Sequence, residues 1–224
     1  MPFLPWNEID TVLLDMDGTL LDTESAARAA FERAIQDVGF DYRAEVYHRC
    51  IGTSHARTQD ILSGAYGPKY DHGALHSRWS ERFMEYTQSH PIAVKPGVER
   101  VLEELSQRNV PMAVATSNRR SVCEQHLAEA NLDRYFRHLV CADEAGQTKP
   151  APDPYLLAVA KLGVVARLSW AVEDSSIGVR SAVTAGLRVF HVPDQAMHAT
   201  QANETHPQST VLQRVDELLQ FLRV

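Results

Sequence analysis

The stretch TVLLDMDGTLLDTE, residues 11–24, decides the fold of this chain. Its apolar run VLL predicts a short strand that is buried on both faces, as in a parallel sheet. Asp15 and Asp17 follow where this strand ends, and Gly18 then permits a sharp turn. Because side chains alternate along a strand, the two aspartates can point the same way. Two carboxylates this close repel each other unless a cation lies between them or one of them holds a proton. The stretch therefore predicts a cation site, a proton-transfer role, or both.

The rest of the chain divides into a helical block and a region in which strands and helices alternate. Residues 22–90 carry apolar side chains at helical spacing, and PIAVKPGV (91–98) is typical of a linker. Beyond it the pattern predicts helices that alternate with strands at 111–118, 137–144, 168–175 and 188–192, then a solvated loop over 194–210 and a closing helix over 211–222. Such alternation indicates a parallel sheet with helices on both faces. We therefore expect an α/β, doubly wound core of residues 1–20 and 92–224, with an inserted all-helical cap of residues 21–91.

The composition argues against several other classes of protein. With 224 residues and 44% apolar content, the chain is long enough to bury a core and is not typical of a disordered protein. Its net charge of −7 and the lack of a basic run argue against a nucleic-acid-binding surface. No apolar run approaches membrane-spanning length, and the N-terminus lacks the features of a secretory signal. Cys50, Cys123 and Cys141 have no metal-type spacing, so we expect buried, inert thiols in a cytoplasmic protein.

Polar residues follow four of the predicted strands. They are Asp15 and Asp17 after the first, Thr116, Ser117 and Asn118 after the second, Lys149 on the loop after the third, and Glu173 and Asp174 after the fourth. In open α/β sheets ligands bind beyond the carboxyl ends of the strands, so we expect these side chains to converge. Together they supply carboxylates for Mg²⁺, a hydroxyl for an anion and a fixed positive charge. That set suits phosphoryl transfer, in which aspartate is a known nucleophile.

Four motifs, taken in order, carry a resemblance to a known family. They are DMDGT (15–19), ATSN (115–118), KPAPDPY (149–155) and VEDSSIG (172–178). The chain resembles the haloacid dehalogenase superfamily, in the phosphatase and β-phosphoglucomutase branch that has a helical cap after the first motif. The match runs from Thr11 to the C-terminal helix. It implies a Rossmann-like core that carries the chemistry.

The resemblance implies a role for each core motif. Asp15 would be the nucleophile that forms an aspartyl-phosphate. Asp17 would be the general acid and then the general base, oriented by Thr19. Thr116 and Lys149 would hold the phosphoryl oxygens, and Lys149 would ease the repulsion between Asp15 and the incoming phosphate.

The resemblance also implies a Mg²⁺ site. The ion would be bound by the carboxylates of Asp15 and Asp174 and by the backbone carbonyl of Asp17. Glu173 would either bind the ion as well or support the residues that do.

The remaining substrate-binding candidates are two residues of the second motif and four of the cap. They are Ser117, Asn118, Gly52, Thr53, Ser54 and Arg57. Asn118 equally suits the N-cap of the next helix. The four cap candidates lie in IGTSHAR (51–57), where a glycine after a helix can let a loop approach the site. We expect the cap to face the catalytic strand ends and to select the substrate.

The preferred function is a Mg²⁺-dependent phosphatase of a small phosphorylated metabolite, acting as a monomer or weak dimer without nucleic acid or membrane. Sugar phosphates, phosphoglycolate and nucleotides are all compatible substrates. A β-phosphoglucomutase-like phosphotransferase is the nearest alternative, but such mutases carry a histidine where this chain has Ala27, and Lys and Arg around the cap glycine where it has Ile51 and His55. Dehalogenases lack the second aspartate, so Asp17 argues against that activity.

Two alternatives come from outside catalysis of this kind. A phospho-aspartate signalling domain also combines an acidic pair, a hydroxyl and a lysine around an acceptor aspartate. Such domains are about half as long, lack a helical insertion and place the acceptor on a later strand. A catalytically silent binding protein is disfavoured because every motif residue is present.

Overall fold

The computed structural model describes residues 8–51, 53, 55–193 and 206–222. Within these residues the chain forms two compact units. We call residues 8–22, 93–193 and 206–222 the core unit, and residues 23–92 the helical unit. No helix in the described ranges is long and apolar enough to cross a membrane.

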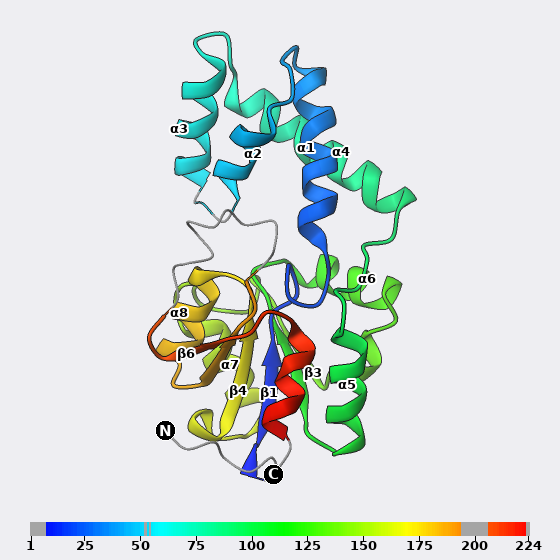
Figure 1. Ribbon diagram of the computed structural model, residues 1–224, viewed down its shortest axis with the longest axis vertical. Coiled ribbons are helices and arrows are strands. Elements are labelled where there is room, and N and C mark those ends of the chain that lie inside the picture. Colours follow the sequence, from blue (N-terminus) through cyan, green and yellow to red (C-terminus); the bar gives the residue numbers. More distant parts are fainter. Residues whose placement is uncertain (1–7, 52, 54, 194–205, 223–224) are drawn as a thin grey trace. The chain divides into compact units, whose positions relative to one another are not determined.

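The core unit is built on a parallel sheet whose strand order is β3-β2-β1-β4-β5-β6 (Figure 1). The strands are β1 (Thr11–Leu14), β2 (Met112–Ala115), β3 (His138–Val140), β4 (Ser169–Glu173), β5 (Arg188–His191) and β6 (Ser209–Val211). Every residue of β1, β2 and β4 is buried, as the apolar runs predict for central strands of a parallel sheet. The register pairs Leu13 of β1 with Ala113 on one side and Ala171 on the other.

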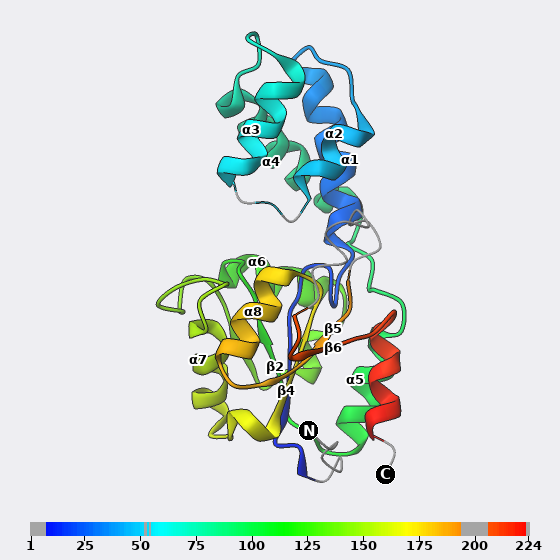
Figure 2. The same cartoon turned by 60° about the vertical axis from the view of Figure 1, so that its left-hand side comes forward.

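Helices cover both faces of this sheet. They are α5 (Val98–Gln107), α6 (Arg120–Glu129), α7 (Asp153–Leu162) and α8 (Ser176–Thr184), with the 3₁₀ helices η2 (Asp133–Tyr135), η3 (Ala166–Leu168) and η4 (Val215–Leu222). Figure 2 shows α7 and α8 on one face, and α5 with η4 on the other. Ala158 of α7 and Val179 of α8 pack with Leu13 and Ala171 in one apolar cluster. The prediction of a doubly wound α/β core is therefore confirmed.

The end of the chain differs from the sequence prediction. The closing helix predicted over 211–222 is a 3₁₀ helix that begins at Val215, and residues 209–211 form β6 beside β5. The predicted loop over 194–210 falls outside the described residues at 194–205, and its last two residues belong to β6. Three residues are too short to show an alternating pattern, whereas Val215, Leu218, Leu219 and Leu222 keep the helical spacing that suggested the longer helix.

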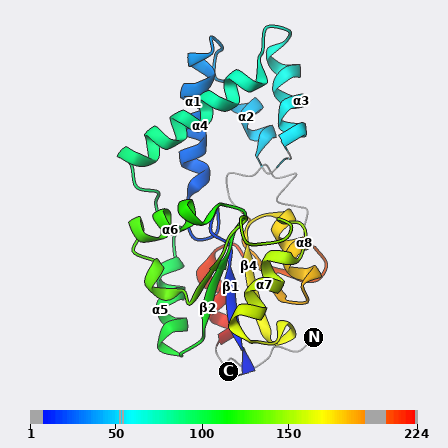
Figure 3. The same cartoon turned by 180° about the vertical axis from the view of Figure 1, so that it is seen from behind.

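The regular secondary structure that is described in the helical unit is all helical (Figure 3). The helices are α1 (Thr23–Asp37), α2 (Ala44–Cys50), α3 (His55–Tyr66) and α4 (His72–Ser89). Phe31 lies at the centre of the apolar cluster, with its ring 4.9 Å from that of Tyr47 and 5.1 Å from that of Trp79. Asp37 at the end of α1 accepts hydrogen bonds of 2.7 Å from both Arg78 and Arg82 of α4. The all-helical cap predicted from periodicity is therefore confirmed.

The three cysteines are free and buried, as expected. Burial raises the pKa of each thiol, which keeps the reactive thiolate scarce.

Candidate active site

The carboxyl ends of β1 and β4 form the centre of the candidate site. The strand order reverses between these two neighbours, because β2 and β3 lie beyond β1 while β5 and β6 lie beyond β4. Ligands bind at such a reversal in open parallel sheets, since the connections on its two sides leave a crevice there. Asp15 directly follows β1, Glu173 ends β4, and Asp174 comes next. The fold thus brings the first and fourth motifs together.

Lys149 is the charged centre of the site. It is almost wholly buried, and its ammonium donates to Asp15 Oδ1 at 2.5 Å and to Glu173 Oε1 at 2.6 Å. The hydroxyl of Tyr155 donates to the same Glu173 oxygen at 2.6 Å. Glu173 is fully buried, so these two donors compensate its charge where water cannot. The arrangement holds a fixed positive charge against the carboxylate of Asp15.

The buried setting shifts the pKa values of these groups. Burial raises the pKa of Asp15 to about 7, against the lowering effect of Lys149 beside it. Burial alone would lower the pKa of Lys149, but the adjacent carboxylates of Asp15 and Glu173 outweigh that effect and raise it. Lys149 is therefore charged at neutral pH. Burial, followed by the charge of Glu173, raises the pKa of Tyr155 well above its ordinary value, so its hydroxyl remains a donor.

Asp17 is held from the end of β2. Asn118 Nδ2 donates to Asp17 Oδ2 at 2.6 Å, and Thr116 Oγ1 lies 3.4 Å from the same oxygen. Asn118 also donates its backbone N–H to Thr116 Oγ1 at 3.1 Å. Asn118 is not the N-cap of α6, because that position is Arg119 and has no side-chain cap bond. The second motif therefore orients Asp17.

The turn after Asp17 requires glycine and carries Thr19 inward. Gly18 has a φ of 78°, in the left-handed region, and a Cβ on it would overlap the carboxylate of Asp174. Thr19 is 2% exposed, and its hydroxyl has no hydrogen-bond partner within the described part of the chain. The expectation that Thr19 orients Asp17 is therefore wrong, since the tight turn buries its side chain.

Three carboxylates lie close enough together to hold a cation. Single oxygens of Asp15, Glu173 and Asp174 all lie within 4.8 Å of one another. Hard oxygen donors of this kind suit Mg²⁺. Glu173 Oε2 is buried and has no hydrogen-bond partner among the residues that the structure describes, so the group has acceptor capacity left over. The residues present therefore fit a Mg²⁺ ion.

Three supporting residues were not assigned a role from the sequence. Tyr155 belongs to the third motif, but nothing in the spacing says that its hydroxyl reaches Glu173. Gly178 of α8 leaves room for the carboxylate of Glu173, which a Cβ would overlap. His191 of β5 is 1% exposed and its Nε2 donates to the backbone oxygen of Asp174 at 2.9 Å. The register that places His191 beside Glu173 is a property of the sheet and has no local sequence signal.

Comparison with known proteins decides the family. The model of the haloacid dehalogenase-like hydrolases matches residues 12–192. The phosphorylated carbohydrates phosphatase of Thermotoga maritima is 30% identical over 185 residues, which cover 82% of this chain and 85% of that protein. This chain belongs to the haloacid dehalogenase-like hydrolase family. The resemblance inferred from the four motifs is thereby confirmed, as is the prediction of an enzyme.

Two further relatives of this hydrolase are similar over nearly the same length. The probable pseudouridine-5′-phosphatase of Drosophila melanogaster is 32% identical over 206 residues, covering 84% of this chain and 86% of that protein. A crystal structure of CbbY from Rhodobacter sphaeroides in complex with xylulose-(1,5)bisphosphate has a TM-score of 0.75 and 26% identity, and covers 96% of this chain and all of that one. The names of the relatives place the hydrolase in the phosphatase branch.

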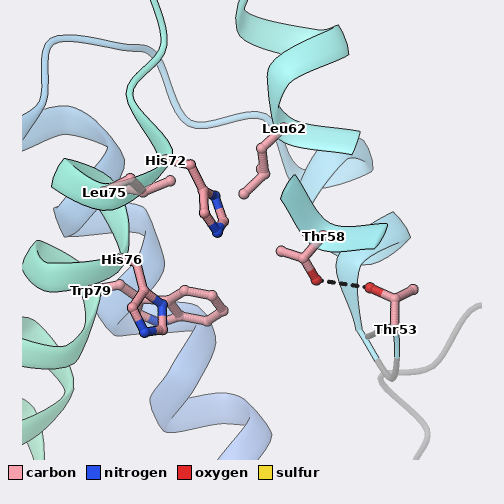
Figure 4. A pocket seen from close by; sticks show the side chains of 7 residues that line it. All are labelled: Thr53, Thr58, Leu62, His72, Leu75, His76 and Trp79. Atoms are coloured by element: carbon pink, nitrogen blue, oxygen red, sulfur yellow. Dashed lines mark hydrogen bonds between the residues drawn. The ribbon is translucent and has the colours of Figure 1, made fainter. Parts of the chain in front are cut away.

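The structure describes three of the five remaining residues that were predicted to bind the substrate. Ser117 is exposed directly after Thr116. In the helical unit, Thr53 is half-buried beside Thr58 (Figure 4) and donates to the backbone oxygen of Cys50 at 2.8 Å, whereas Arg57 is exposed on α3. Gly52 and Ser54 lie outside the described residues.

Proposed function

We propose that this hydrolase is a Mg²⁺-dependent phosphatase that cleaves a small phosphate monoester through an aspartyl-phosphate on Asp15. The observation that carries the proposal is the buried ion pair in which Lys149 is held between Asp15 and Glu173. A carboxylate nucleophile repels a phosphate dianion, and a fixed, desolvated ammonium beside it offsets that repulsion. Relatives named as phosphatases support the same reaction.

The metal site would use residues already placed by the two central strands. Asp15 and Asp174 would hold Mg²⁺ through their carboxylates, together with the backbone carbonyl of Asp17. When bound, the ion would neutralise charge on the phosphoryl oxygens. Glu173 shares one oxygen with Lys149 and Tyr155, so we assign it first to holding that lysine.

In the first half of the reaction, one carboxylate oxygen of Asp15 forms a bond to phosphorus and the ester P–O bond breaks. Lys149 and the hydroxyl of Thr116 bind the phosphoryl oxygens and position them. The carboxyl of Asp17, held by Asn118, gives its proton to the departing alkoxide. The product of this half is an alcohol and a phosphorylated Asp15.

In the second half, water attacks the phosphorus and the bond from phosphorus to Asp15 breaks. Asp17, now ionised, takes a proton from that water as it attacks, so the same side chain works as acid and then as base. Asp15 and Asp17 are thereby restored, and inorganic phosphate leaves.

The phosphotransferase alternative receives less support from the helical unit. Mutases of this branch carry a histidine at the position of Ala27, where this chain has only a methyl group. The backbone oxygen of Ala27 accepts a hydrogen bond of 2.9 Å from Trp79 Nε1, so that position serves the packing of α1 and α4.

Phosphate release from p-nitrophenyl phosphate tests the proposal. We expect turnover with Mg²⁺, no turnover in excess chelator, and recovery when Mg²⁺ is restored. Asp15→Asn should abolish turnover while circular dichroism shows an unchanged fold, and Asp133→Asn, which changes an exposed carboxylate, is the matched control. Undiminished release in excess chelator, or wild-type rates from Asp15→Asn, would refute the proposal.

A further inference from the structure

A buried histidine of the neighbouring strand holds the main chain of Asp174. His191 is the last residue of β5 and pairs in register with Glu173, the last residue of β4. Its Nε2 lies 2.9 Å from the backbone oxygen of Asp174. A carbonyl oxygen can only accept a hydrogen bond, so Nε2 carries the ring proton and Nδ1 carries a lone pair. The contact therefore fixes both the tautomer of the ring and the place of this carbonyl.

The hydrogen bond is made where the chain passes from a strand to a helix. Up to the end of β4 the sheet itself holds the main chain, and Val192 donates its backbone N–H to the oxygen of Glu173 at 2.7 Å. Asp174 lies one residue beyond β4, and Ser175 is already the N-cap of α8. A residue between two elements has no repeating ladder to satisfy its backbone groups, so a side chain must supply the bond. The imidazole of His191 supplies it here.

His191 can restrain its neighbour because its own place is fixed. Its backbone oxygen accepts a hydrogen bond of 2.8 Å from Leu212, and β5 lies between β4 and β6 in the sheet. The residue is 1% exposed, and buried side chains are packed closely in single rotamers. The ring therefore transmits the rigidity of the sheet to the peptide group that follows Asp174.

The direction of the Asp174 side chain matters because the place for it is narrow. A Cβ on Gly18 would overlap its carboxylate. Single oxygens of this carboxylate, of Asp15 and of Glu173 lie within 4.8 Å of one another, as a shared cation requires. Mg²⁺ demands near-ideal octahedral geometry with oxygens at about 2.0–2.1 Å, so it tolerates little displacement of a ligand. A rotation of the peptide group after Asp174 would swing the carboxylate away from the other two.

We propose that His191 is a positioning residue for the Mg²⁺ site, and that its bond to the backbone of Asp174 sets the direction of that carboxylate. The inference rests on the proposed Mg²⁺-dependent function. His191 acts only through Asp174, so it should govern the affinity for the ion more than the chemical step. Its Nδ1 is buried without a hydrogen-bond partner in the described part of the chain, so a replacement needs to supply only one donor.

Two substitutions of similar volume separate the hydrogen bond from the packing. His191→Met removes the donor, whereas His191→Gln keeps an N–H at the end of a side chain of similar length. We expect the Kd for Mg²⁺, measured by calorimetry without substrate, to rise about ten-fold in His191→Met and less than about three-fold in His191→Gln. His126→Met should leave this Kd unchanged, and it is the matched control because His126 is a buried histidine on α6 of the same unit.

The kinetic constants should divide in the same way. In His191→Met the Mg²⁺ concentration that gives half-maximal hydrolysis of p-nitrophenyl phosphate should rise with the Kd. The kcat at saturating Mg²⁺ should fall less than the affinity does, because excess ion fills the weakened site. A defect of the fold alone would instead lower kcat at every Mg²⁺ concentration.

An NMR measurement on the unmodified protein does not depend on whether a variant folds. The Nε2–H of His191 should give a slowly exchanging signal, because it is buried and hydrogen-bonded. Titration with Mg²⁺ should shift this signal, and NaCl at the same ionic strength should not.

The outcomes separate this inference from the proposed function. A wild-type Kd in His191→Met, equal losses in the Met and Gln variants, or a His191 signal that Mg²⁺ does not shift would overturn the role of His191 alone. A wild-type protein that neither binds Mg²⁺ nor needs it to release phosphate would refute the proposed function and the inference with it.

Discussion

At the scale of single residues, the site depends on a chain of contacts from Tyr155 through Glu173 and Lys149 to Asp15. Each member compensates the charge of the next in a place that water does not reach. Removing the hydroxyl of Tyr155 should therefore disturb Lys149 and Asp15, although none of the hydrogen bonds described above joins Tyr155 to Asp15 directly.

Tyr155→Phe should lower kcat about 10- to 100-fold, because residues that orient functional groups typically have effects of this size. It should also lower the free energy of unfolding by about 2 kcal/mol, since it removes a buried hydrogen bond to a charged group without changing the shape of the ring. Steady-state kinetics with p-nitrophenyl phosphate and urea denaturation measure the two effects.

Tyr135→Phe is the control for this change, because Tyr135 lies in the short 3₁₀ helix η2 and its hydroxyl accepts a hydrogen bond of 3.0 Å from Arg134 on the exposed side of the core unit. If Tyr155→Phe is as active as Tyr135→Phe, Tyr155 does not position Glu173 and the chain of contacts carries no catalytic role.

At the scale of elements, α8 and β4 must pack closely enough for Glu173 to lie against Gly178. Gly178→Ala places a Cβ on that carboxylate, so Glu173 has to move. We expect a loss of at least about 100-fold in kcat/KM, in line with the effect of displacing a catalytic group by an ångström, and a loss of about 1–3 kcal/mol in stability from overpacking.

Gly64→Ala is the control for Gly178→Ala, because it also adds a methyl group to a helical glycine. Gly64 lies in α3, and a Cβ added there would have no atom within 4 Å. It should raise the free energy of unfolding by about 0.5–1 kcal/mol, since alanine restricts the unfolded chain and favours a helix. Equal activity of the two alanine variants, with both folded by circular dichroism, would contradict the account of Gly178.

The pairing of α1 with α4 gives a prediction about pH. Hydrogen bonds from Arg82 and then Arg78 lower the pKa of Asp37 from 3.8 to about 2. A carboxylate whose pKa is lower in the folded state stabilises the fold above its unfolded pKa and stops doing so as pH falls through the folded pKa. Asp37→Asn should therefore lower Tm at pH 7, by a small amount because the pair is solvent-accessible, and the difference from wild type should shrink between pH 4 and pH 2.

Thermal denaturation at several pH values and two salt concentrations checks this expectation. High salt should reduce the effect at pH 7. A difference in Tm that grows as the pH falls would show that Asp37 does not act as a paired carboxylate.

Part of the site can be predicted from the sequence, and part of it cannot. The apolar runs of β1, β3 and β4 and the motifs after them predict where Asp15, Lys149 and Asp174 lie, because strand ends of a parallel sheet share one edge. The roles of Tyr155, Gly178 and His191 depend on how α7, α8 and β5 dock on that edge, and no local pattern encodes docking. β6 was missed because three paired residues at a sheet edge carry too little periodicity.

At the scale of the whole molecule, all the groups that we assign to the reaction lie in the core unit. The core unit holds the groups that act on the phosphoryl group, and these cannot distinguish one ester from another. Changes to these groups should therefore alter the rate on every ester.

The central claim is that Asp15 becomes phosphorylated, and chemical trapping tests it most directly. The enzyme, and an Asp17→Asn variant, are mixed with p-nitrophenyl phosphate and Mg²⁺, quenched and reduced with borohydride, which converts an aspartyl-phosphate to homoserine. p-Nitrophenol leaves without an acid catalyst but water needs a base to attack, so the intermediate should accumulate in the variant. We predict homoserine at position 15 in the tryptic peptide that ends at Arg28, and none in Asp15→Asn. Continued phosphate release with Asp15 unmodified, or with the label at another residue, would contradict the account.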